Sequence, residues 1–351
     1  MRAARYHGRG DLRLEDVPEP STGAGDVKLR VLYAGICGTD IHEVYDGPVF
    51  VPVARPHPLT GVQAPVILGH ELCGEVVEVG EGVTTVAPGD LVAVEPLQPC
   101  GRCAYCTSGA YNLCPTRAAH GLARAGGGFA EFTVVAERMV HGLPPGLSAI
   151  QGALVEPMSV GVHAVKLTHA RPGSWVAVHG LGPIGLGVLL ALRARGVQTI
   201  ASDPSSRRRS AVEALGFRHV LDPVAGDVAE AIGELTDGRG VEASVDAAGV
   251  PAALAAALGS TAVHGRIVVV AVPLEPLTLP IPAFRRHEVT LTMSGGQLAE
   301  DFHDTIAGME RGDYPHEGWV ETIRFDDLLT EGFEPLHRQE KLKVLVDVGA
   351  G

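Results

Sequence analysis

Residues 175–185 read WVAVHGLGPIG, an apolar run that leads directly into three closely spaced glycines. Such a run is typical of a buried strand that turns into the start of a helix. The glycines match G-x-G-x-x-G: the first makes the turn, the second lets a pyrophosphate approach the backbone, and the third lets helix and strand pack closely. The stretch therefore predicts a dinucleotide site at a helix N-terminus, where N–H groups favour anions. The predicted contacts are Gly180, Gly182, Pro183, Ile184 and Gly185.

The next predicted strand, QTIASD, ends in an acidic residue. Asp203 lies 18 residues beyond Gly185 (203 − 185), where a carboxylate would hold the adenosine ribose hydroxyls. A carboxylate at this position repels a 2′-phosphate, which favours NAD over NADP. Arg207, Arg208 and Arg209 follow, and arginines are how a 2′-phosphate is accommodated. A solvated helix face is the alternative for these arginines, and we prefer it for two of the three, with Arg208 as a cofactor contact.

The sequence pattern changes near residue 150. Before it, short apolar runs alternate with glycine, proline and aspartate, which is typical of a β-rich domain. From Pro172 to about residue 290, strand-like runs alternate with helix-like stretches, which predicts βαβ units and a parallel sheet. The run KLKVLVDV predicts a last strand that returns to one of the domains. A chain of 351 residues agrees with about two domains, so we expect an α/β protein.

Four cysteines lie close together in CGRCAYCTSGAYNLC, residues 100–114. Two successive Cys-x2-Cys spacings wrap a chain around a metal, and four thiolates complete the tetrahedron that zinc prefers. No position is left open for a substrate, so this site is predicted to be structural. An iron–sulfur cluster and a redox-active CxxC pair are the alternatives. The predicted ligands are Cys100, Cys103, Cys106 and Cys114.

Three other segments, GICGTDIH, LGHELCG and LVEP, each carry a residue type that binds zinc. Taken one at a time, each has an ordinary structural explanation: Cys37 as a buried thiol, His70 as a core imidazole and Glu156 as a helix cap. Glu71 stands beside His70. We interpret Cys73 as a small apolar residue in a strand.

Composition excludes some classes of protein. The net charge is −13, from 41 acidic and 28 basic side chains, which argues against a nucleic-acid-binding surface. The first twenty residues carry scattered charges and no apolar core, so they do not resemble a signal peptide. The uncharged stretch 172–192 is interrupted by glycine and proline, so we expect a strand, a turn and a buried helix instead of a membrane span. A cytoplasmic enzyme with unpaired cysteines is the expectation.

GHE followed by GEVVEVGEGV, the four-cysteine run and GLGPIG, in this order, resemble the zinc-dependent medium-chain dehydrogenase/reductase family over essentially the whole chain. The segments GICGTDIHEVYDGP and HPLTGVQAPVILGHE are most similar to its 2,3-butanediol dehydrogenase branch, with sorbitol and other polyol dehydrogenases close by. The resemblance implies a GroES-like catalytic domain with a structural zinc lobe (1–151) and a Rossmann doubly wound domain (152–290). A C-terminal segment (291–351) would return to the catalytic domain, with the active site in the cleft.

The resemblance also implies a catalytic zinc held by Cys37 and His70, with Glu71 and Glu156 on its carboxylate side. Whether either glutamate binds directly or through water stays open. Thr39 would take the proton from the reacting hydroxyl and His42 would pass it on, with a surface histidine as the alternative for His42. Asp40 would support or cap the site. The resemblance places further cofactor contacts at Ala248, Val270, Ser294 and Lys343.

The implied reaction is reversible hydride transfer between NAD and a vicinal diol such as 2,3-butanediol, giving acetoin, from a zinc-bound alkoxide. Glu43, where sorbitol dehydrogenases tend to carry an aromatic residue, and the loop 48–62 favour a small diol. A polyol or other secondary-alcohol dehydrogenase is the nearest alternative, and a non-catalytic zinc module is the alternative from another class. We expect two zinc ions per chain, no nucleic-acid or membrane partner, and a homodimer or homotetramer, often formed through the sheet edge near GRIVVVAV.

Overall fold

The computed structural model describes residues 1–273, 276–279 and 281–349. Its backbone forms two compact units. Unit 1 consists of Met1–Glu156, Leu298–Ile306 and Trp319–Gly351, and unit 2 consists of Pro157–Gln297 and Ala307–Gly318. Within the described residues, no helix combines the length and the apolar character that a membrane span needs.

Unit 2 contains a six-stranded sheet in which every neighbouring pair is parallel. The strands lie in the order β13-β12-β11-β14-β15-β16. In chain order this is 3-2-1-4-5-6, the order of dinucleotide-binding doubly wound sheets, so the predicted parallel sheet is confirmed. The strands are β11 (Trp175–His179), β12 (Gln198–Ser202), β13 (Val220–Leu221), β14 (Val241–Asp246), β15 (Thr261–Val269) and β16 (Thr290–Met293).

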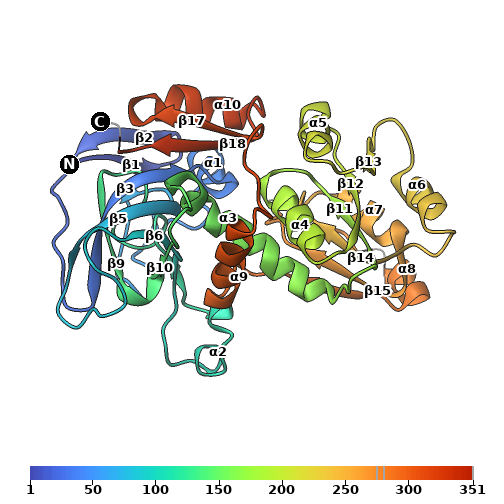
Figure 1. Cartoon of the computed structure of the whole chain (residues 1–351), viewed down its shortest axis with the longest axis horizontal. Helices are drawn as coiled ribbons and strands as arrows, with labels where there is room; N and C mark the ends of the chain where they lie inside the picture. The colour runs from blue at the N-terminus through green and yellow to red at the C-terminus, as the bar shows by residue number, and fades with distance from the viewer. Residues whose placement is uncertain (274–275, 280, 350–351) are drawn as a thin grey trace. The chain divides into compact units, whose positions relative to one another are not determined.

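Helices cover this sheet because their apolar residues face it. Helix α4 packs on β11 and β12, and α7 packs on β11, β14 and β15 (Figure 1). Residues 185–192 of α4 are all buried, which explains its uncharged sequence. The helices of the chain from residue 149 to 310 are α3 (Ala149–Thr168), α4 (Pro183–Ala194), α5 (Ser206–Ala214), α6 (Val228–Leu235), α7 (Pro251–Ser260), α8 (Ile281–His287) and α9 (Ala299–Glu310).

Helix α6 and strand β16 are among the elements of unit 2 that were not anticipated from the sequence. Helix α6 begins at Asp227, whose carboxylate accepts N–H bonds from Ala229 and Glu230, a capping signal that could have predicted it. Strand β16 is the second. A sheet edge was expected near GRIVVVAV, which overlaps β15. That expectation is corrected, because β15 pairs with β14 on one side and with β16 on the other. The open edge on this side of the sheet is therefore β16.

Unit 1 contains a mixed seven-stranded sheet, a three-stranded sheet and a two-stranded sheet formed by β7 and β8. The larger sheet runs β10-β6-β5-β3-β18-β17, with β9 also paired to β3, and the three-stranded sheet runs β2-β1-β4. The strands are β1 (Arg2–Gly8), β2 (Asp11–Asp16), β3 (Asp26–Gly35), β4 (Val66–Ile67), β5 (Glu71–Val79), β6 (Leu91–Val94), β7 (Leu97–Gln98), β8 (Ala118–Ala119), β9 (Phe132–Ala136), β10 (Val140–Gly142), β17 (Val320–Arg324) and β18 (Lys343–Asp347).

Short helices connect these strands. They are α1 (Gly38–Tyr45), α2 (Ala104–Thr107), η1 (Tyr111–Leu113), η2 (Glu137–Met139), η3 (Phe325–Asp327), η4 (Leu328–Phe333) and α10 (Glu334–His337). Strand β18 runs antiparallel to β3 and parallel to the edge strand β17, so the predicted last strand is an interior strand of the larger sheet. Segments from both ends of the sequence therefore build one sheet.

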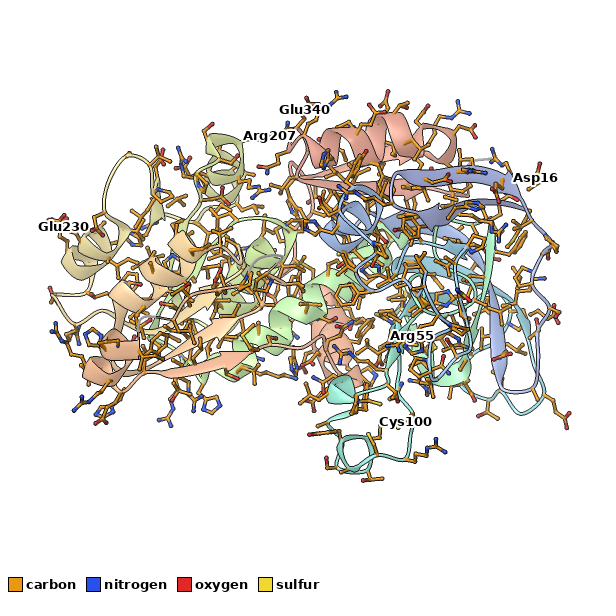
Figure 2. All side chains as sticks on the ribbon, turned by 180° about the vertical axis from the view of Figure 1, so that it is seen from behind. Asp16, Arg55, Cys100, Arg207, Glu230 and Glu340 are labelled. Atoms are coloured by element: carbon orange, nitrogen blue, oxygen red, sulfur yellow. The ribbon has the colours of Figure 1, made fainter. Side chains whose placement is uncertain are left out.

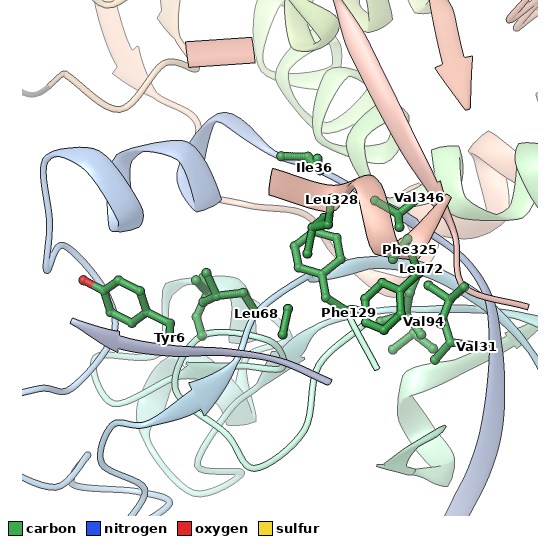
Figure 3. Packing of buried hydrophobic residues seen from close by; sticks show 14 of the residues in the cluster. Tyr6, Val31, Ile36, Leu68, Leu72, Val94, Phe129, Phe325, Leu328 and Val346 are labelled. Atoms are coloured by element: carbon green, nitrogen blue, oxygen red, sulfur yellow. The ribbon is translucent and has the colours of Figure 1, made fainter. Parts of the chain in front are cut away.

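One cluster of buried apolar side chains joins the seven-stranded and three-stranded sheets of unit 1 (Figure 3). Each fully buried Val, Leu or Phe side chain contributes about 1.5–3 kcal/mol relative to an exposed one. Because η3, η4 and β18 contribute as well as β1 to β6, the core fixes the positions of both β3 and α1. The residues labelled in Figure 3 are Tyr6, Val31, Ile36, Leu68, Leu72, Val94, Phe129, Phe325, Leu328 and Val346.

Candidate functional site

Three potential metal ligands meet where β3 ends and β5 begins. Cys37 is the N-cap of α1, just after β3, and His70 and Glu71 stand at the start of β5. One ligand atom from each of the three lies within 4.8 Å of the other two. His70 and Glu71 are buried and Cys37 is partly buried. Neighbouring antiparallel strands thus bring together residues that are more than thirty positions apart in the sequence.

A buried carboxylate orients two of these ligands. Asp40 Oδ2 accepts the backbone N–H of Cys37 at 3.0 Å, and Asp40 Oδ1 lies 3.5 Å from Nδ1 of His70. With Nδ1 facing a carboxylate, Nε2 is left for a metal, as in many zinc sites. Burial lowers the pKa of His70, but Asp40 and Cys37 raise it, and the result is well above its ordinary value. The surroundings of His70 therefore favour a positive charge.

Lys343 belongs to this site. Its ammonium is buried in unit 1, donates to the carbonyl oxygen of Ile36 at 3.0 Å and pairs with the Glu71 carboxylate. Gly35 leaves the room for this pair, since an added Cβ would collide with Glu71. The family resemblance suggested only a cofactor contact for Lys343, and that contact stays a prediction. The sequence does hold a hint of this ion pair: Lys343 begins the apolar run KVLV, and a lysine in a buried strand needs a charged partner.

The donor set fits zinc. Thiolate, imidazole and carboxylate are the three zinc ligand types, and three protein ligands leave the fourth position of a tetrahedron open, as catalysis requires. Glu156, the fourth predicted member, is buried on α3 and is not among the three residues whose ligand atoms meet in the described structure. Its part at the metal stays a prediction.

The predicted proton carriers lie on α1. Thr39 is partly buried in the first turn, two residues after Cys37. His42 lies on a more open face, with a 40% exposed side chain whose Nδ1 is 2.8 Å from Asp46 Oδ2. An imidazole paired with a carboxylate at the surface can exchange protons with water. The geometry therefore suits His42 to the outer end of a relay.

The four clustered cysteines form a second site in unit 1. Their sulfur atoms lie within 4.8 Å of one another, with Cys103 and Cys106 at 3.4 Å and Cys100 and Cys106 at 3.9 Å. A tetrahedron with Zn–S distances of about 2.3 Å has S–S edges of about 3.8 Å, so zinc fits. Backbone N–H groups of Arg102 and Cys103 lower the pKa of Cys100 to about 6, which favours its thiolate. Figure 2 shows Cys100 on the loop around α2.

In unit 2, the glycine-rich turn has the geometry that its sequence predicts. Gly180 has a φ of +95° and lies against Ala248, so a side chain there would be strained. A Cβ at Gly185 would collide with the carbonyl of Gly180. A Cβ at Gly182, the N-cap of α4, would meet no described atom within 4 Å. Close packing at two glycines and open space at the helix N-terminus between them suit a pyrophosphate.

Asp203 is buried directly behind this turn. Its Oδ2 accepts the backbone N–H of Leu181 at 2.7 Å and lies 3.4 Å from Nη1 of Arg208. Arg207 is exposed (Figure 2). The preference for two solvated arginines is wrong for Arg209, whose side chain is 17% exposed because it pairs with the Asp222 carboxylate at 2.7 Å.

The remaining predicted cofactor residues follow the ends of β14, β15 and β16. The backbone N–H groups of Ala248 and Gly249 donate to Asp246 Oδ1, both at 2.9 Å. Ser294 N donates to Val269 O at 2.8 Å. Ala248, Val270 and Ser294 thus stand at the carboxyl edge of one parallel sheet, where such sheets bind ligands.

Comparisons with known proteins agree with both units. Residues 23–145 match the profile of the alcohol dehydrogenase GroES-like domain, and residues 183–311 match that of the zinc-binding dehydrogenase. The chain is 40% identical to the (R,R)-butanediol dehydrogenase of Bacillus subtilis over 99% of both chains. It is 37% identical to the sorbitol dehydrogenase of Bacillus subtilis over 81% of this chain and 79% of that protein.

Solved structures show the same fold. The crystal structure of 2R,3R-butanediol dehydrogenase from Bacillus subtilis superposes with a TM-score of 0.92 at 40% identity, covering 99% of each chain. A zinc-binding dehydrogenase from Sinorhizobium meliloti, bound to NADP, gives a TM-score of 0.89 at 30% identity, covering 99% of this chain and 98% of that one. The predicted GroES-like and Rossmann folds are confirmed.

Proposed function

Because the chain belongs to the zinc-binding dehydrogenase family and is an oxidoreductase that acts on CH–OH groups, we propose that it oxidises 2,3-butanediol to acetoin and catalyses the reverse reduction. The meeting of Cys37, His70 and Glu71 carries this proposal. Full-length similarity to butanediol dehydrogenases supports the diol as substrate. Sorbitol or another polyol is the second candidate, supported by the sorbitol dehydrogenase relatives.

The reaction converts a secondary alcohol and an oxidised nicotinamide into a ketone, a reduced nicotinamide and a proton. A zinc ion, when bound, supplies Lewis acidity that lowers the pKa of a hydroxyl group. Cys37, His70 and Glu71 would hold it, with Glu156 as a further carboxylate. Asp40 keeps the His70 ring turned toward the site. Lys343 balances the buried negative charge of Glu71 while that carboxylate is not bound to a metal.

The released proton needs a path to water. Thr39 would accept it from the substrate hydroxyl, since it follows Cys37 in the first turn of α1. His42, three residues further on the same helix, would receive it and exchange it with solvent, assisted by Asp46. We propose these proton-transfer roles for Thr39 and His42, both of which lie on α1.

We propose NAD as the hydride acceptor and two zinc ions per chain. The turn from Gly180 to Gly185 would bind the pyrophosphate at the N-terminus of α4. Asp203 would accept hydrogen bonds from the ribose and repel a 2′-phosphate. The four-cysteine site would hold the second, structural zinc.

Replacing Asp203 by alanine is expected to raise the ratio of kcat/KM with NADP to that with NAD about 100-fold. The substitution removes the repelling carboxylate and leaves Arg208 to face the phosphate. The substitution also removes the carboxylate that accepts the Leu181 N–H and so weakens the turn for both cofactors. The ratio of the two kcat/KM values is therefore more informative than either value alone. Asp237→Ala, which removes an exposed carboxylate of unit 2 that pairs with Arg239, is the control. An unchanged ratio in Asp203→Ala would exclude this role.

The substrate proposal is tested by measuring NAD reduction with each 2,3-butanediol stereoisomer and with sorbitol, and the reverse reaction with acetoin. We expect kcat/KM for one diol stereoisomer to exceed that for sorbitol about 100-fold or more, because a site that fits a small diol disfavours a longer polyol. Turnover of sorbitol alone would favour the second candidate. No turnover of any alcohol, with one zinc per chain, would favour a non-catalytic zinc module.

We also propose that the chain forms a homodimer or homotetramer. Strand β16 supports this, because it is an open sheet edge and Met293 on it is 56% exposed. Val272 and Ile281, also exposed, precede this strand in the sequence. A monomer in sedimentation velocity at assay concentrations would contradict it. The absence of disulfide bonds among the six cysteines, all of them in the described part of the chain, supports the cytoplasm as its location.

A further inference from the structure

Two histidines of unit 1 meet outside both of the sites described above. His141 lies on β10, and His303 lies in the part of α9 that belongs to unit 1. His141 Nδ1 is 3.3 Å from His303 Nε2, although the two residues are 162 positions apart in the sequence. The proposed reaction uses neither histidine. Two facing imidazoles form either an ordinary hydrogen bond or a pair of metal ligands, and their surroundings separate these alternatives.

The ring of His141 is held in one orientation. Its side chain is 6% exposed, and the ring stacks on the buried ring of Phe302 with centroids 4.7 Å apart. Its Nε2 lies 3.2 Å from Oε2 of Glu95, a carboxylate that is 1% exposed. A carboxylate accepts a hydrogen bond, so Nε2 carries the proton and Nδ1 presents its lone pair toward His303. This tautomer is the one that can bind a metal through Nδ1.

The buried carboxylate favours a cation at this place. In metal sites, the ring nitrogen that does not bind the ion usually donates to a carboxylate, which fixes the tautomer and makes the binding nitrogen more basic. Glu95 has this relation to His141, as Asp40 has to His70. Because Glu95 is buried together with the imidazole, its negative charge is screened less by water and attracts a nearby cation more strongly.

The distance between the two facing nitrogens suits a metal ion. With Zn–N bonds of about 2.0–2.1 Å, two nitrogens of a tetrahedral site are about 3.3–3.4 Å apart. The 3.3 Å between His141 Nδ1 and His303 Nε2 matches this edge. The two ring planes differ by 69°, so the imidazoles do not stack on each other. His303 is exposed, so its ring can adjust and water can complete the coordination of an ion.

We propose that His141 and His303 form a third metal site, which binds a divalent transition-metal ion such as zinc through Nδ1 of His141 and Nε2 of His303. Glu95 is its positioning residue, since it contacts His141 and not the ion. Imidazole nitrogens suit zinc, nickel and copper, whereas magnesium and calcium prefer oxygen ligands. Two protein ligands leave the other positions to water, so the ion is held more weakly than by four thiolates. A bound ion would join β10 to α9 within unit 1.

Nickel binding to the zinc-loaded, untagged full chain is the test, because nickel suits imidazole ligands and can be counted apart from zinc. Equilibrium dialysis against nickel chloride, followed by metal analysis, is expected to give one nickel ion per chain without loss of zinc. His303→Ala removes one ligand at an exposed position, and the dissociation constant for nickel is expected to rise at least about tenfold. At a nickel concentration about 100 times the wild-type dissociation constant, the melting temperature is expected to rise by about 3 °C in the wild type only.

His264→Ala is the matched control. His264 is also an exposed imidazole beside a carboxylate, with Nδ1 3.4 Å from Oε2 of Glu288, and within the described part of the chain this partner is an acid and not a second imidazole. The variant is expected to bind nickel as the wild type does. Glu95→Gln tests the positioning role, because it keeps the size of the side chain and removes its charge. The affinity for nickel is expected to fall about 10–100-fold.

The outcomes are distinct. A wild-type chain that binds no nickel at millimolar concentration overturns the site, and so does unchanged binding in His303→Ala. Equal losses in His303→Ala and His264→Ala overturn it as well, because nickel then binds exposed histidines in general. Uptake of nickel with release of zinc would place the ion in one of the other two sites and overturns this one. Unchanged affinity in Glu95→Gln overturns the role of Glu95. His303→Ala decides the site even where Glu95→Gln does not fold.

The inference stands apart from the proposed function. Nickel binding is measured without substrate or cofactor, and it uses no residue of the proposed reaction. A chain that oxidises no vicinal diol therefore overturns the proposed function alone, and a chain that oxidises the diol without binding nickel overturns the third site alone.

Discussion

Replacing Cys37 by alanine is expected to lower the rate of diol oxidation about a thousandfold or more, because loss of the catalytic metal removes its stabilisation of charge on the reacting oxygen. Cys37 supplies one of the three ligand atoms that meet at this site in the described residues, so its loss leaves the set incomplete. Metal analysis is expected to give one zinc per chain in place of two. Steady-state kinetics and metal content are measured on the same preparation.

Cys73→Ala is the matched control for this substitution. Cys73 is a fully buried thiol on β5, outside both groups of metal ligands, and burial raises its pKa far above the ordinary value. A neutral buried thiol behaves as a small apolar group. Cys73→Ala is therefore expected to keep both zinc ions and most of the activity. Full activity of Cys37→Ala would mean that the reaction does not depend on this site.

Replacing Cys103 by serine is expected to remove the second zinc and to lower the melting temperature by about 10 °C or more. Helix α2 has only four residues and none of them is buried, so the loop has little apolar core of its own. Binding of structural zinc has a free energy of about 10–16 kcal/mol in small zinc-binding peptides, and part of such binding energy would stabilise the folded loop here. Thermal unfolding followed by circular dichroism, together with metal analysis, measures both effects.

The control for the loop is Thr107→Ala. Thr107 Oγ1 donates to the carbonyl oxygens of Cys103 and Ala104, both at 3.2 Å, and the residue is exposed. Loss of these bonds is expected to shift the melting temperature by less than about 3 °C. If Cys103→Ser melts at the wild-type temperature and keeps two zinc ions, the four thiols do not form a structural metal site.

Local patterns allowed much of the fold to be predicted. The turn at Gly180 and the spacing of the four cysteines are encoded within short segments, so they could be recognised without the structure. The strand β16 was missed because its alternation of polar and apolar residues, TLTM, is only four residues long, and its identity as a strand depends on pairing with β15. The prediction that Arg209 is solvated was wrong for a similar reason. Its partner Asp222 lies on another segment of the chain, so local sequence does not reveal the ion pair.

At the metal site, residue types could be predicted but contacts could not. Cys37, His70 and Glu71 were chosen through a family resemblance, and the order of strands then brings them together. The pairing of Glu71 with Lys343 and the binding of the 49–51 backbone by Glu43 have no local sequence signal. Such contacts depend on the tertiary arrangement, which propensity and spacing do not encode.

The pairing of Lys343 with Glu71 has a consequence for biosynthesis. Glu71 leaves the ribosome 272 residues before its partner, so a nascent chain carries an acid destined for burial without its counterion throughout most of translation. Strand β3 is separated even further from its partner β18, since Gly35 pairs with Leu345, 310 residues later (345 − 35). The first unit to be translated can therefore reach its mature form only after the other unit has emerged, and holding chaperones have a defined interval in which to act.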